Sequence, residues 1–199
     1  MENLKFTPVQ LDALKEIFNI GAGNAATALS VLINNNVKMS VPCVNIIKFD
    51  KLYDNELHKE VYGVAVRVLG EIPGNILIIF DNNAVLELNK ILLGEYCIKK
   101  CDYYESLLSE LGNILSSSCM NSIAEVTGIN IVPSVPAVTN DLLSTILGTM
   151  FIESGQYEDY VLDIETVFKG KEEFFSGMNF YYIPEIESLE KIFKSIGMN

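Results

Sequence analysis

Apolar residues recur at steps of three and four along the first part of the chain, after a short segment that can start a helix. Thr7 and Gln10 have the spacing of a capping box, and Pro8 suits the first helical position. The periodicity predicts one helix that runs to about Asn34. Its apolar stripe comprises Leu11, Leu14, Phe18, Ala22, Ala25, Leu29 and Leu32.

Apolar and polar residues then alternate, which is typical of β-strands. The range 37–49 predicts a strand, and Pro42 within it indicates an edge position or a bulge, because proline cannot donate to a strand ladder. Two more predicted strands, at 61–69 and 75–80, flank a turn rich in glycine and proline. A predicted helix at 84–93 follows them.

The same order of elements restarts near Asp102. Asp102 and Glu105 have capping-box spacing, and a second apolar stripe predicts a long helix that ends before Gly128. The range 129–138 alternates like a strand and, like the first strand, contains prolines. The last predicted elements are strands at 160–168 and 174–183 and a final helix opened by Pro184.

The chain of 199 residues therefore looks like a tandem duplication with an offset of 94 residues and repeats at about 7–98 and 102–199. Each half is too small and too open to form a domain alone. We expect an α+β fold: a single domain over 1–199, with pseudo-two-fold symmetry, one shared and mostly antiparallel sheet, and two long helices. The residues repeated at the offset are Glu16 and Glu110, Asn19 and Asn113, and Pro42 and Pro136.

The segment Gly21-Ala-Gly23-Asn-Ala-Ala26 matches the loose dinucleotide fingerprint G-x-G-x-x-[GA]. That fingerprint requires a strand before the glycines and a helix that opens at them. Here the glycines lie well inside a predicted helix, and the repeat has Leu115 and Ser117 in their places. We therefore reject a nucleotide site and expect these small residues to let another element approach closely.

Polar residues cluster on one side of each long helix. At about 100° per residue, Asp12, Glu16 and Asn19 fall in one narrow sector, about 120° from the centre of the apolar stripe. Ser106, Glu110 and Asn113 form the same cluster on the second helix. An ordinary solvated face would explain one such cluster. Its recurrence, with a proline at the same distance, favours a functional site in each half.

The two segments D-x-x-x-E-x-x-N and S-x-x-x-E-x-x-N, with Pro42 and Pro136 downstream, resemble the CheC family of chemotaxis phosphatases. The stretch NIGAGNAATALS is similar to that family as well, and the resemblance extends from Leu11 to the final helix. CheX proteins are similar but carry one motif. FliY proteins add a flagellar switch domain, and FliM proteins lack the paired Glu and Asn. The two-motif CheC type fits best.

The resemblance implies a hydrolase that removes the phosphoryl group from the phosphorylated aspartate of the response regulator CheY, in the two-component signalling of chemotaxis. Catalysis would fall to Asn19 and Asn113, which position water, and to Glu16 and Glu110, which pair with a lysine of the regulator. A neutral amide suits this task because it holds water without adding negative charge near the phosphoryl oxygens. Asp12 and Ser106 would lie at the docking rim, and Pro42 and Pro136 would shape the strand beside each helix.

The resemblance also implies that the protein needs no cofactor of its own, since Mg²⁺ would be bound by the response regulator. Members of the family also bind the receptor-modifying deamidase CheD. Because two internal copies supply the symmetry that a one-motif relative would need a dimer to obtain, we expect a monomer.

Composition narrows the classes of partner. The formal net charge of −12 disfavours nucleic acid and anionic membranes. We expect a cytoplasmic protein, because the sequence shows no signal-peptide pattern and no apolar run of membrane-spanning length. Its four cysteines lack paired ligand spacing, so no metal site is expected, and His58, the sole histidine, lies in a polar connection that favours solvation.

Two non-enzymatic classes of function stay open beside the enzyme. The chain could be a binding module that sequesters phosphorylated CheY or mainly regulates CheD, although the intact Glu and Asn in both copies favour catalysis. It could also be a structural subunit of the flagellar switch, like FliM. Release of phosphate from the phosphorylated regulator distinguishes the enzyme from both alternatives.

Overall fold

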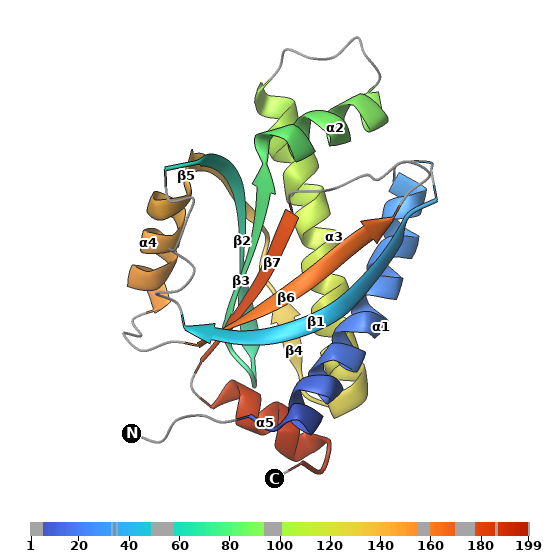
Figure 1. Cartoon of the computed structure of the whole chain (residues 1–199), viewed down its shortest axis with the longest axis vertical. Helices are drawn as coiled ribbons and strands as arrows, with labels where there is room; N and C mark the ends of the chain where they lie inside the picture. Colours follow the sequence, from blue (N-terminus) through green and yellow to red (C-terminus); the bar gives the residue numbers. More distant parts are fainter. Residues whose placement is uncertain are drawn as a thin grey trace.

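A computed structural model describes residues 6–32, 34, 36–48, 58–93, 101–154, 160–169, 178–185 and 187–198 (Figure 1). Helices and the strands of a single sheet follow one another along these residues in an α+β arrangement. The elements in chain order are α1 (Pro8–Leu32), β1 (Lys38–Lys48), β2 (Glu60–Gly70), β3 (Gly74–Asp81), α2 (Asn82–Leu93), α3 (Cys101–Thr127), β4 (Ile131–Pro133), β5 (Ala137–Leu142), α4 (Leu143–Ser154), β6 (Tyr160–Lys169), β7 (Met178–Pro184) and α5 (Ser188–Ser195).

The first helix begins as the capping box predicts. The Gln10 N–H donates to Thr7 Oγ1 at 3.3 Å, and the Thr7 N–H donates to Gln10 Oε1 at 2.8 Å. Two of the N–H groups that a helix start leaves unpaired are thereby satisfied. The second long helix already includes Cys101, so the predicted cap at Asp102 is wrong by at least one residue.

The sheet has the order β1-β6-β7-β3-β2-β4, with β5 also paired to β2, and the pairs along it are antiparallel. The third strands of the two predicted halves, β3 and β7, pair at the centre. The first strand of each half pairs with the second strand of the other half, as β1 does with β6. This interleaved order is what a duplicated unit with a shared sheet would produce.

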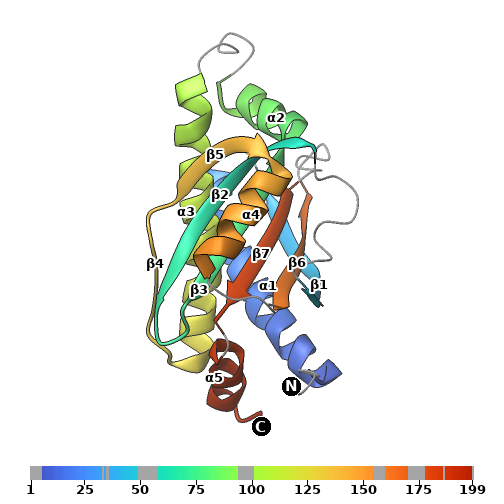
Figure 2. The ribbon, with the colours of Figure 1, turned by 90° about the vertical axis from the view of Figure 1, so that its left-hand side faces the viewer.

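Helices cover both faces of the sheet (Figures 1 and 2). The main core lies between the sheet and the pair α1 and α3, and it contains Phe18, Leu111 and Ile78. A second cluster lies under α4, where Ile146 and Met150 pack against the opposite face. The α1–α3 layer therefore has a buried side, toward the sheet, and an exposed side that carries Glu16 and Glu110.

Three elements differ from the predictions. The predicted strand at 129–138 is two short strands, because the chain leaves the ladder between Pro133 and Ala137, around the second proline. The sequence did not reveal α4, whose apolar residues do not keep to one face: Leu147 is buried, whereas Ile152 is 80% exposed. The final helix begins at Ser188, four residues after Pro184, which still pairs with Gly74 at the end of β7.

Candidate functional site

The two long helices cross at the glycine that the nucleotide fingerprint had singled out. A Cβ atom on Gly21 would lie 2.9 Å from Ser122 Oγ and 3.0 Å from both the Cys119 Cα and the Ser118 carbonyl oxygen. The expectation that small residues in this segment permit close approach is confirmed at Gly21. The helices run in opposite directions (Figure 1). Because each motif lies in the first half of its helix, the two motifs lie at opposite ends of the helix pair.

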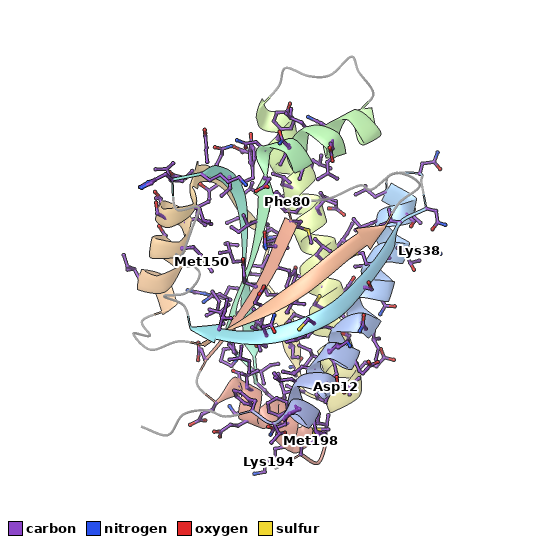
Figure 3. The ribbon with its side chains drawn as sticks, in the orientation of Figure 1. Asp12, Lys38, Phe80, Met150, Lys194 and Met198 are labelled. Atoms are coloured by element: carbon purple, nitrogen blue, oxygen red, sulfur yellow. The ribbon has the colours of Figure 1, made fainter. Side chains whose placement is uncertain are left out.

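The first motif presents its carboxylates to solvent on α1. Asp12 and Glu16 are exposed, and Figure 3 shows Asp12 near the start of the helix. Asn19, one turn later, is half-buried. Its carboxamide is fully oriented by one residue of β1: Nδ2 donates to the Val41 carbonyl at 3.1 Å, and Oδ1 accepts from the Val41 N–H at 2.7 Å.

The partner of Asn19 lies where β1 departs from its regular ladder. The pairing of β1 with β6 shifts register between Ser40 and Cys43, and Val41 and Pro42 fall in that irregularity. The edge position and the bulge that Pro42 indicated are both confirmed. The distance of 22 residues from Asn19 to Val41 therefore has a structural meaning: it brings the residue before the proline back to the motif helix.

The second motif is more open. Ser106, Glu110 and Asn113 are all exposed on α3. Asn113 Oδ1 accepts a long hydrogen bond, 3.5 Å, from the Ser117 hydroxyl. Val135, which occupies the place of Val41 in the repeat, is 86% exposed, whereas Val41 is 3% exposed.

The loop before Pro136 forms its hydrogen bonds within itself and with β2 of the first half. The Val135 carbonyl accepts from the Ser134 hydroxyl at 3.1 Å, and the Ser134 N–H donates to the Arg67 carbonyl at 2.8 Å. Pro136 nevertheless lies beside the motif helix, since a Cβ atom on Gly112 would lie 3.5 Å from the Pro136 Cβ. Val41, the residue before Pro42, and Pro136 itself thus each lie next to the helix that carries the corresponding asparagine.

Other candidate residues lie apart from these motifs. His58 is exposed in a turn before β2. Burial raises the pKa of the Cys119 thiol to about 12, while Cys43 is half-buried; the side chains of Cys97 and Cys101 fall outside the described residues. Within the described ranges, no cluster of three or more His, Cys, Asp or Glu side chains could hold a metal ion. No helix in those ranges is both long and apolar enough to cross a membrane.

Sequence reasoning located the motif residues but missed what holds them. The partner of Asn19 is a backbone group, and backbone partners leave no residue-type signature. The signal that was available is the repeated distance between asparagine and proline, which indicated that strand and helix meet. The hydroxyl of Ser117 gave no such signal, because the corresponding residue in the first half is Gly23.

Comparison with known proteins agrees with these features. The CheC-like family model matches residues 9–46 and 105–139, two segments that contain both motifs and both motif prolines. The chain is 29% identical over 196 residues to the CheY-P phosphatase CheC of Bacillus subtilis, covering 94% of each chain.

Solved structures support the fold. FliY of Thermotoga maritima superposes with a TM-score of 0.79 at 23% identity, covering 98% of both chains. The FliM middle domain of H. pylori gives a TM-score of 0.63 at 10% identity, with 96% of this chain and 99% of that chain covered. The chain is therefore similar to the CheC-like family in its two motif segments, to a CheC along nearly its whole length, and to FliY in its fold.

Proposed function

We propose that the protein is a phosphatase that accelerates hydrolysis of the aspartyl phosphate on a CheY-type response regulator. One observation carries the proposal: a Glu and an Asn one turn apart occur twice, on two long helices that expose both Glu side chains, within the two segments that the CheC-like family model matches. The B. subtilis relative, whose name states this activity, is similar over nearly the whole chain.

Hydrolysis of an aspartyl phosphate requires few catalytic groups from this protein. An acyl phosphate is activated, and its hydrolysis passes through a loose transition state in which positioning and electrostatics dominate. In this proposal the carboxamide of Asn19 or Asn113 holds a water in line with the phosphorus. A neutral amide does so without the repulsion that a carboxylate would exert on the phosphoryl oxygens.

The glutamates serve docking. Glu16 and Glu110 are exposed, one helical turn before each asparagine, where a carboxylate can pair with a lysine of the regulator. Asp12 and Ser106 lie one turn further out and contribute to the rim of the same contact. Exposed pairs of this kind are individually weak and screened by salt, so they set register more than affinity.

The metal ion belongs to the substrate in this proposal. Mg²⁺ on the response regulator would neutralise charge at the phosphoryl group, and the described residues of this chain would supply only the amide and the carboxylate. Binding of a CheD-type deamidase and a monomeric state are further expectations, which a pull-down and size-exclusion chromatography with light scattering would measure.

The test is release of inorganic phosphate from a phosphorylated CheY-type regulator in Mg²⁺, with and without this protein. We expect acceleration by the unchanged protein and none by the double variant Asn19→Ala with Asn113→Ala. Two exposed residues outside the motifs provide matched controls: Asn179→Ala on β7 and Glu87→Gln on α2 should keep the full rate. The variant Glu16→Gln with Glu110→Gln should raise the regulator concentration needed for half-maximal rate.

Three outcomes would contradict the proposal. Undiminished turnover by the folded double asparagine variant would remove both amides from the mechanism. Tight binding of the phosphorylated regulator without faster phosphate release would indicate a protein that sequesters it. An unchanged half-saturating concentration in the double glutamate variant, combined with a rate that follows a titrating carboxylate, would indicate a general base instead of a docking group.

A further inference from the structure

The two motif asparagines are held in different ways. We propose that Asn19 is latched to β1 in the resting protein while Asn113 is presented freely, so that the second site carries most of the turnover. This inference rests on the proposed function for its consequence, but the latch itself is a feature of the fold and can be measured without any substrate.

The Asn19 carboxamide matches the hydrogen-bonding groups of the β1 backbone. The carboxamide donates to and accepts from the same residue, Val41, as a neighbouring strand would. Val41 is 3% exposed and lies in the register shift of β1, where the regular pairing with β6 is interrupted. Buried backbone groups need partners. Asn19 supplies both partners to this peptide segment and thereby anchors the edge strand to the helix.

The two bonds to Val41 use half of the hydrogen-bonding capacity of the Asn19 carboxamide. A carboxamide has two N–H donors and two acceptor lone pairs. At Asn19 one donor and one lone pair are used, and the half-buried side chain is fixed in orientation by both bonds. To turn both of its N–H donors toward a phosphorylated partner, the side chain must leave Val41. Two net hydrogen bonds to backbone reduce the population of the released state by roughly tenfold to a hundredfold.

The second half contrasts with the first. The Val135 carbonyl accepts from Ser134, and no hydrogen bond joins Asn113 to Val135 within the described part of the chain. Asn113 is exposed, and among the described residues its Oδ1 accepts one side-chain hydrogen bond, the 3.5 Å bond from Ser117. In the described part of the chain no hydrogen bond joins the side-chain N–H groups of Asn113 to backbone, so Asn113 lacks the competing partner that Asn19 has and no latch has to open before it can bind.

The experiment compares Asn19→Ala with Asn113→Ala in the full chain, with Asn179→Ala as the exposed-asparagine control. Hydrogen exchange of the Val41 amide, followed by NMR, reports the latch without substrate. We expect exchange at Val41 to become at least about tenfold faster in Asn19→Ala and to stay unchanged in the other two variants. Asn19→Asp should also loosen Val41, because a carboxylate oxygen would replace the donor that lies 3.1 Å from the Val41 carbonyl.

The rate of phosphate release from the phosphorylated regulator then shows how much of the turnover depends on Asn19 and how much on Asn113. We expect Asn113→Ala to lose about tenfold or more of the acceleration and Asn19→Ala to lose less than twofold, the share of the first site. Equal Val41 exchange in unchanged protein and Asn19→Ala would overturn the latch. A larger rate loss in Asn19→Ala than in Asn113→Ala, with Val41 protection intact in the latter, would overturn the division of labour while leaving the phosphatase function standing. If the unchanged protein gives no acceleration, the proposed function and the turnover claim fall together, and the exchange data alone decide the latch.

Discussion

A methyl group added at the crossing of α1 and α3 should destabilise the protein, whereas the same group two residues later should not. At Gly21 the new Cβ would lie 3.0 Å from two backbone atoms of α3, the Cys119 Cα and the Ser118 carbonyl oxygen, and 2.9 Å from Ser122 Oγ. Backbone atoms cannot rotate away, so the helices must separate. Overpacking of this kind costs about 1–3 kcal/mol.

Gly23 provides the matched control in the same helix. It is exposed, and a Cβ there would meet nothing within 4 Å. Replacing a helical glycine by alanine favours folding by roughly 0.5–1 kcal/mol, and this gain applies to both positions. Gly23→Ala should therefore be more stable than the unchanged protein. The difference in unfolding free energy between the two variants isolates the overpacking cost, about 1–3 kcal/mol.

Urea unfolding followed by circular dichroism measures this difference. In thermal unfolding it corresponds to roughly 2–12 °C between the two variants for a chain of this size. Unfolding free energies that agree within about 0.3 kcal/mol would contradict the close contact of α1 and α3 at Gly21. The same result would reopen the question of why the sequence keeps a glycine there.

Three further predictions concern caps and buried titratable groups. Thr7→Ala should lower the unfolding free energy by about 1 kcal/mol, because the cap that Thr7 and Gln10 form at the start of α1 is lost. Iodoacetamide at pH 8 should modify Cys43 in the native protein and leave Cys119 unmodified, as peptide mass spectrometry would show; equal labelling would contradict the burial of Cys119. Burial raises the pKa of the Cys119 thiol, and burial with the nearby Asp163 charge raises that of the Tyr181 phenol, each to about 12. Since both folded values exceed the ordinary 9.0 and 10.0, their contribution to stability is complete below pH 9 and is lost as the pH rises toward 12, so urea midpoints should fall over that range.

The elements with strong periodicity could be predicted from the sequence. The stripe of α1 and the alternation along much of β2 match the burial that the fold gives them, because one face of each element meets the main core. The strand β3 is instead a short apolar run, and residues 76–80 are all buried because both faces of the sheet are covered there. The helix α4 could not be predicted in this way. Its exposed Ile152 breaks the pattern that Ile146 and Met150 would otherwise show, and its contact with the far face of the sheet is a tertiary effect.

In the candidate site, too, some features could be predicted from local geometry and others depend on tertiary contacts. The sequence placed Glu16 and Glu110 on solvent-exposed helix faces, because helical geometry alone determines that sector. It placed Asn19 in the same sector, but the structure makes it half-buried and bonded to Val41. Residue 19 lies at the margin of the sector that faces β1, and only the path of that strand decides whether such a residue meets solvent or backbone.

The interleaved sheet joins the two motif segments into one fold. Asn19 is anchored to β1, and β1 pairs along its length with β6, which comes from the other half of the sequence. In the same way β5, which follows Pro136, pairs with β2 of the first half. Each motif helix therefore rests on a strand whose ladder partner lies in the opposite repeat. A single repeat would leave that strand without its ladder partner, with unpaired backbone groups beside the asparagine. The geometry of each site is set by both halves together, although all of its motif residues come from one half.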